Sequence, residues 1–88
     1  MDSRFRVEVR AGHRNPLRHG SWGADLYRVI LSAPDEATAE LLSVGQVRAY
    51  LTLHFPWLSI TSAAVTGEPQ PLDPGDATPE GVTEIGPA

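Results

Sequence analysis

The chain has 88 residues and no cysteine, which limits it to one domain with a small core and excludes disulfides and thiolate metal sites. Its formal net charge of -4 divides into +3 over residues 1–28 and -7 over residues 29–88, so basic and acidic residues lie in different parts of the chain. No apolar run approaches the roughly 18 residues of a membrane helix, and the charged start MDSRFRVEVR does not match a signal peptide, so we expect a cytoplasmic protein with no membrane partner.

Two stretches alternate between apolar and other residues with the period of two that is typical of a half-buried strand. They are residues 4–11, with Phe5, Val7 and Val9 on one face, and residues 26–33, with Tyr27, Val29 and Leu31 on one face. The segment between them contains Gly12, Gly20, Gly23 and the pair Asn15-Pro16, and it exceeds an ordinary hairpin turn. We therefore predict a long basic loop over residues 11–25.

Residues 34–55 predict a helix, because Pro34 suits the first helical position and Asp35 and Glu36 favour the positive end of the helix dipole. Pro56 ends this helix. Residues 58–66 are rich in β-branched side chains and predict a third strand. From residue 67 onward the chain interleaves proline, glycine and acids with few apolar residues, which predicts an acidic tail that is disordered or docked.

This order predicts an α+β domain over residues 1–66, followed by the tail over 67–88. The domain is a small three-stranded mixed sheet with one helix packed on one face, in the order ββαβ. A strand-helix-strand crossover makes its two flanking strands parallel. The first strand is then antiparallel to them and lies either between them or at an edge.

The predicted helix has two apolar stripes when its residues are placed at 100° intervals. We expect the first stripe to face the sheet; it comprises Ala37, Leu41, Val44, Val47, Leu51 and Phe55. A second stripe of Ala39, Leu42, Ala49 and Leu53 lies roughly opposite, beside Gly45 and Gln46. Either the loop or the tail covers this second stripe within one chain, or it binds a second copy or another protein. The candidate partner-binding residues are Leu42, Gly45, Gln46, Ala49 and Leu53.

Arginines dominate the first strand and the predicted loop. The candidate contacts for an anion or an acidic partner are Arg4, Arg6, Arg10, Arg14, Arg18, Arg28 and Trp22. Because Phe5 and Tyr27 are predicted to face the helix, this face lacks aromatic rings on which bases could stack, so nucleic-acid binding is the alternative function rather than the first. A Glu8–Arg28 cross-strand pair, or the acidic tail lying along these arginines, would use the charge within the protein.

The sequence predicts no enzyme. It has no thiol, no serine in a recognisable nucleophile motif, and no phosphate-binding loop. The spacing of His13, His19 and His54 matches no metal-ligand pattern. We therefore assign no catalytic, cofactor-binding or metal-binding residue.

The stretch YRVILSAPDEATAELLSVGQVRAYL and the later ITSAAV together resemble small uncharacterised strand-helix-strand proteins of actinobacteria and actinobacteriophages. The resemblance covers about residues 26–66. It implies a GC-rich host and an accessory or phage-encoded protein, and carries over no functional residue. The function we expect is a non-enzymatic interaction or assembly module that associates as a homodimer, or with another protein, through the second helix stripe.

Overall fold

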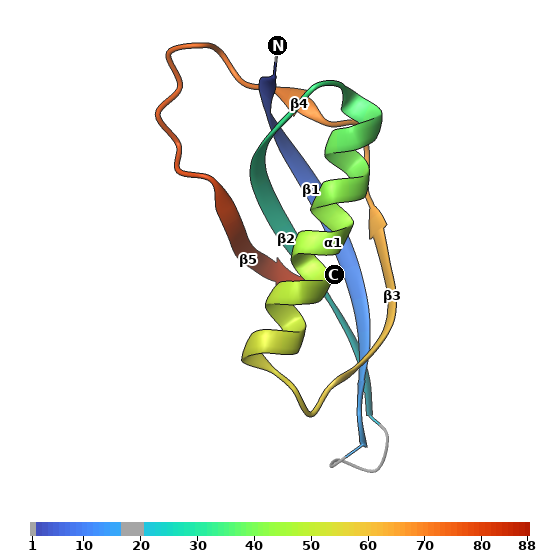
Figure 1. The fold of residues 1–88 in the computed structure, drawn as a ribbon. Coiled ribbons are helices and arrows are strands. Elements are labelled where there is room, and N and C mark those ends of the chain that lie inside the picture. The colour runs from blue at the N-terminus through green and yellow to red at the C-terminus, as the bar shows by residue number, and fades with distance from the viewer. Residues whose placement is uncertain (1, 17–20) are drawn as a thin grey trace.

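The computed structural model describes residues 2–16 and 21–88, which form one helix and a five-stranded antiparallel sheet (Figure 1). The elements are β1 (Ser3–Asn15), β2 (Ser21–Ala33), α1 (Glu36–His54), β3 (Ser59–Val65), β4 (Gln70–Pro71) and β5 (Gly81–Pro87). The strand order is β3-β1-β2-β5, and β4 also pairs with β1. The α+β class is confirmed, but the predicted mixed sheet of three strands is wrong, because there are five strands and every pair is antiparallel. Because β2 and β3 are both antiparallel to β1, β1 lies between two parallel strands.

The segment predicted as a long loop is the far half of a β-hairpin. The pairing of β1 with β2 continues without interruption from Ser3 opposite Ala33 to Asn15 opposite Ser21. Residues 11–15 and 21–25 are therefore strand, and the prediction of a loop over 11–25 was wrong. Glycine is common in turns, but it also occurs in a strand where another chain segment approaches closely.

One face of the sheet forms the core against α1. The sheet contributes side chains at alternate positions of β1 and β2, namely Phe5, Val7, Val9, Ala11, Tyr27, Val29, Leu31 and Ala33. The buried residues of α1 are Ala39, Ser43, Val47 and Leu51, a single row at intervals of four. The helix-facing set predicted for the second strand is thus confirmed.

The predicted sheet-facing stripe of the helix was wrong at its start, because Ala37 and Leu41 are exposed and Ala39 is fully buried. The reason is Ser43, whose polar side chain hides the true row from a hydropathy pattern. Its hydroxyl donates to the Ala39 carbonyl at 2.6 Å, so it is fully buried without an unpaired polar group. Small side chains at 39 and 43 leave room for the sheet.

Both ends of α1 are fixed by hydrogen bonds. The Asp35 carboxylate accepts from the Thr38 backbone N–H at 2.7 Å, which makes Asp35 the N-cap and lowers its pKa. Pro34 therefore precedes the cap instead of opening the helix. At the other end, the Phe55 N–H donates to the Leu51 carbonyl at 2.8 Å. The Phe55 ring packs edge-on against Trp57, with centroids 5.8 Å apart.

The acidic tail is docked, through backbone pairing more than through apolar contact. β4 pairs with β1 at one edge, the chain crosses the end of the sheet, and β5 pairs with β2 at the other edge (Figure 1). Val82 packs against the core. The Arg4 guanidinium donates to the carbonyls of Asp76 and Thr78 and so holds the crossing segment to β1.

We predict that Arg4→Gln loosens the crossing segment while the core stays folded, because neither carbonyl then keeps its cationic donor. The expected loss of stability is about 1 kcal/mol, since these hydrogen bonds are partly open to water. Hydrogen exchange should accelerate in residues 72–80. Arg10→Gln removes the same charge from the same strand and serves as the control. Equal acceleration in both variants would contradict the role given to Arg4.

We predict that the protein loses stability between pH 10 and pH 12 through ionisation of Tyr27. Burial, with smaller contributions from the carboxylates of Asp25 and Glu84, raises the pKa of Tyr27 from 10.0 to about 12. The folded state thus favours the neutral phenol, so this stabilisation is present below pH 10 and declines as the pH rises through the folded pKa. The chain has no lysine to titrate in this range. Urea midpoints should fall between pH 10 and pH 12 in the wild type and stay nearly level in Tyr27→Phe.

Candidate functional site

The fold leaves two surfaces without a layer over them. The first, which we call the outer helix face, consists of the residues of α1 that point away from the sheet, namely Ala37, Leu41, Leu42, Gly45, Gln46, Ala49 and Leu53. The second, which we call the arginine face, lies on the side of the sheet away from α1 and carries Arg6, Arg10, Arg14, Arg28 and Trp22. Neither surface contains a residue of the core cluster.

The outer helix face is apolar and open. Leu41 is 77 % exposed, Leu53 is 76 % exposed and Leu42 is 45 % exposed. Gln46 and Ala49 are also exposed, and a Cβ added at Gly45 would meet no atom within 4 Å. Of the predicted second stripe, only Ala39 is turned into the core. The reading in which Trp22 or the tail covers these leucines within one chain was wrong.

A groove adjoins this face. It lies between α1 and the strand edge, is lined by Glu40, Leu41, Val44, Val65 and Gly67, and has a volume of about 390 Å³. Leu41 belongs to both the groove and the outer helix face. The apolar surface therefore continues from the helix towards β3.

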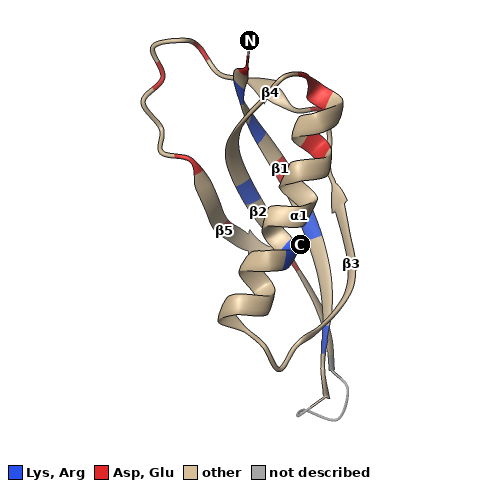
Figure 2. Ribbon diagram, in the orientation of Figure 1, with Lys and Arg blue, Asp and Glu red and all other residues tan. Residues whose placement is uncertain are grey.

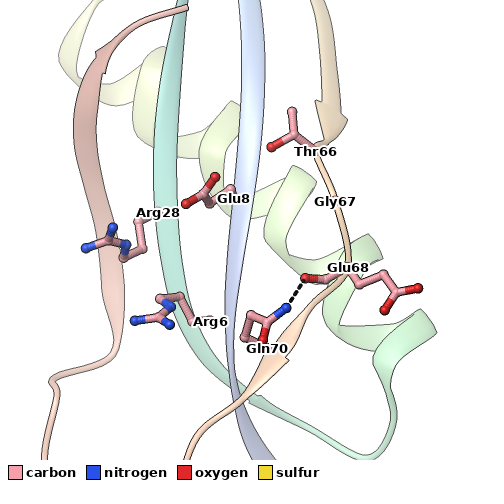
Figure 3. A pocket seen from close by; sticks show the side chains of 7 residues that line it. All are labelled: Arg6, Glu8, Arg28, Thr66, Gly67, Glu68 and Gln70. Carbon is pink, nitrogen blue, oxygen red and sulfur yellow. Dashed lines mark hydrogen bonds between the residues drawn. The ribbon is translucent and has the colours of Figure 1, made fainter.

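The arginine face follows from the same alternation that builds the core. Arg6, Glu8 and Arg10 are the intervening residues of β1, and Glu8 stands directly opposite Arg28 of β2. Figure 3 shows Arg6 and Glu8 extending from β1 and Arg28 from β2 on the side away from α1. Together with Thr66, Gly67, Glu68 and Gln70 they line a polar pocket of about 370 Å³, so two acids and two arginines share it.

Trp22 adds an aromatic ring to this face, contrary to the expectation from sequence. It stands opposite Arg14 in the hairpin, and the Arg14 guanidinium carbon lies 5.6 Å from the centroid of the Trp22 ring. The indole is 70 % exposed. With Arg10, Gly12, Thr61 and Ser62 it lines a second pocket of about 370 Å³, which Ala88 also borders.

Among the described residues, no arginine of the arginine face forms an ion pair with a carboxylate. Within residues 2–16 and 21–88, one basic and one acidic side chain approach closer than 4.0 Å, namely His13 and Asp25. The expected Glu8–Arg28 pair is therefore in register but does not form a salt bridge. Figure 2 shows acidic residues at the start of α1 and between β4 and β5, while Glu8 of β1 and Asp25 of β2 lie on the same strands as the arginines.

Two of the predicted anion contacts are not assigned to this surface. The Arg4 side chain is used by the crossing segment, as described above. Arg18 lies outside the described residues, as does His19. The remaining four arginines and Trp22 are brought together by the extended hairpin.

Sequence reasoning missed the pair between His13 and Asp25. The His13 Nε2 atom lies 2.9 Å from the Asp25 carboxylate, across the hairpin. The His13 ring rests on Gly23, where an added Cβ would come within 2.8 Å of it. Among the described residues, the hydroxyl groups that donate hydrogen bonds do not donate to His13. The described residues also contain no group of three or more potential metal ligands. Period-two counting through residues 11–25 would have placed the two side chains on one face.

Comparison with protein-family models, with curated proteins and with solved structures finds no match to this chain. The resemblance to actinobacterial and phage proteins therefore stays a prediction. No helix in the described part of the chain is long and apolar enough to cross a membrane. The geometry of the two surfaces is the basis for a functional proposal.

We predict that Gly12→Val destabilises the protein by about 1–3 kcal/mol through overpacking. A Cβ at position 12 would lie 2.7 Å from the Ser62 hydroxyl and 3.0 Å from the Thr61 hydroxyl, so these side chains have to rotate away or β3 has to shift. Urea denaturation measures the loss. The control is Gly67→Ala, because Gly67 has open space around it but a φ of 72° that disfavours a side chain. Greater damage at Gly67 than at Gly12 would show that backbone conformation outweighs the contact.

Proposed function

We propose that this protein is a non-enzymatic association module that forms a homodimer through the outer helix face. One observation carries the proposal. Ala37, Leu41, Gly45, Ala49 and Leu53 are all exposed, and they form an unbroken apolar row at intervals of four along α1. Rows at this spacing are the ridges that interlock when helices pack.

The row is complementary to itself. Gly45 is the midpoint of α1, which runs from residue 36 to residue 54. A two-fold axis at Gly45 would place Leu41 against Ala49 of the second copy, and Ala37 against its Leu53. Each large side chain then meets a small one, as close packing requires.

Gly45 allows the two helices to approach closely at this axis. A glycine inside a helix costs about 1 kcal/mol relative to alanine. Nothing within the chain requires it, because a Cβ would stand in open space. Contact between two helix backbones is a physical reason for a glycine at this position.

The expected dimer is weak and depends on concentration. The 19 residues of α1 give a stripe about 28 Å long, and at a width of about 10 Å its area of about 280 Å² per copy lies below the usual range of stable specific interfaces. The groove beside Leu41 adds apolar area. We therefore expect a dissociation constant in the micromolar to millimolar range, about 10 µM to 1 mM.

We predict that Leu41→Asp abolishes the dimer and leaves the fold unchanged. Leu41 is mostly exposed in the single chain, so the substitution removes little packing within it, whereas in the dimer it would bury a carboxylate on both sides of the axis. Light scattering coupled to size exclusion, over concentrations of about 10 µM to 1 mM, gives the mass. Circular dichroism and urea denaturation verify the fold.

The matched control is Ala64→Asp. Ala64 is an exposed residue of β3 opposite Arg10, so this variant gains the same charge away from α1. It should dimerise as the wild type does. A wild type that stays monomeric at every concentration refutes the proposal, and a Leu41→Asp variant that still dimerises places the interface elsewhere.

A further inference from the structure

We infer that the arginine face binds single-stranded nucleic acid, with Trp22 as the stacking platform and the arginines as phosphate contacts. This inference does not rest on the proposed dimer, because α1 and the arginine face lie on opposite sides of the sheet (Figure 3). It requires a ring that bases can reach, cations that form no ion pair with a carboxylate, and a surface open along its length. The hairpin supplies all three.

Trp22 is the ring. Its indole is 70 % exposed, although burying such a large apolar group would be favourable. The guanidinium carbon of its neighbour Arg14 lies 5.6 Å from the centroid of the ring, and most of the ring surface stays open. Exposed aromatic rings beside cations are the features with which proteins bind single strands, since every base has a face that stacks.

The cations form a line. Arg6, Arg10 and Arg14 follow one another at intervals of four along β1, which corresponds to about 13 Å between successive members. Arg28 lies beside this line on β2, opposite Glu8. Two acids lie beside this line, Glu8 between Arg6 and Arg10 and Glu68 in the pocket of Arg6 and Arg28, but no described carboxylate lies within 4.0 Å of these guanidinium groups. With four arginines against two acids, the surface keeps a net positive charge.

The pocket beside Trp22 provides a place for a sugar-phosphate unit. Gly12 forms part of its floor, and the absence of a side chain there leaves the hydroxyls of Ser62 and Thr61 accessible next to Arg10. Hydroxyls and arginine are common partners of phosphate and sugar oxygens. Base stacking on Trp22 and backbone contacts from Arg10 can thus occur within one pocket.

An acidic peptide would pair with the arginines but would offer no base to stack on the Trp22 indole. A duplex would present phosphates while its bases stay stacked on one another and out of reach of Trp22. Single strands alone use both features, and this decides the class of ligand. The other two ligands serve as comparisons in the test.

The experiment measures fluorescence anisotropy of a labelled oligothymidylate of about 12 nucleotides at several salt concentrations. We expect binding at low salt that falls steeply as salt rises. Trp22→Ala should weaken binding about 5- to 100-fold. Arg10→Gln and Arg28→Gln should each flatten the slope of log K against log salt by about 0.7.

Two matched controls separate the site from general effects of charge and aromaticity. Arg48→Gln removes the same charge from the exposed side of α1, and Trp57→Ala removes the other tryptophan of the chain. Both should leave affinity and salt slope unchanged. Circular dichroism of every variant verifies folding, which the exposure of Trp22 and of these arginines favours.

Four results would overturn the inference. They are no anisotropy change at low salt, an effect of Arg48→Gln equal to that of Arg10→Gln, equal competition by an oligoglutamate of the same length, and equal binding of a duplex of the same length. The third result would assign the face to acidic peptides. The fourth would remove the role of Trp22.

Discussion

The uninterrupted pairing of β1 with β2 is the constraint on which the rest of the structure depends. Thirteen residues of each strand are in register, and alternation sends Val7, Val9 and Val29 to one face and the arginines to the other. A shift by one residue would exchange the two faces completely. The apolar face requires a cover, and α1 is the element that provides it. β3, β4 and β5 then complete the hydrogen bonding at the edges of the hairpin.

The single helix α1 is too short to cover the whole length of this hairpin. A strand of thirteen residues is about 43 Å long, whereas α1 is about 28 Å long. The turn end of the hairpin therefore extends past the helix, which accounts for a molecule 46 Å long and only 18 Å thick (Figure 1). His13 and Trp22 lie in this extension. The two candidate surfaces are thus consequences of a two-layer fold, one on the outside of each layer.

The sequence predicted the core of the hairpin well and its length poorly. Alternating apolar residues at 5–9 and 27–31 leave little choice of structure, but at 11–15 the pattern passes through Gly12 and Asn15, which are typical of turns. Their role depends on what lies across the strand, such as the hydroxyls of β3 above Gly12. The sequence around Gly12 does not show which residues lie on the neighbouring strand. For the same reason the arginine face was predicted without its aromatic ring, because Trp22 was placed in a loop.

The tail was the hardest part to predict, since its contribution to folding comes mainly from backbone groups. β5 contributes Val82 to the core, and its further contacts are the hydrogen bonds that complete the edge of β2. Composition measures apolar content, so it does not register such a strand. The helix shows the opposite case. Its sequence predicted that a helix forms, but the apolar pattern did not identify which residues face the sheet.

The rotation of α1 about its own axis explains why the outer helix face could be predicted in part. Burying the small row at 39 and 43 turns α1 so that Leu41 joins the exposed side, which makes that side more apolar than the sequence had indicated. Had Leu41 faced the sheet, the row through Gly45 would keep Leu53 as its one leucine and would lose the match to Ala49. With Ser43 buried, Leu41 and Leu53 stand on opposite sides of Gly45, and each has an alanine at the same distance on the other side. The hydrogen bond that lets one serine enter the core thus also determines whether the opposite side of the helix is complementary to itself.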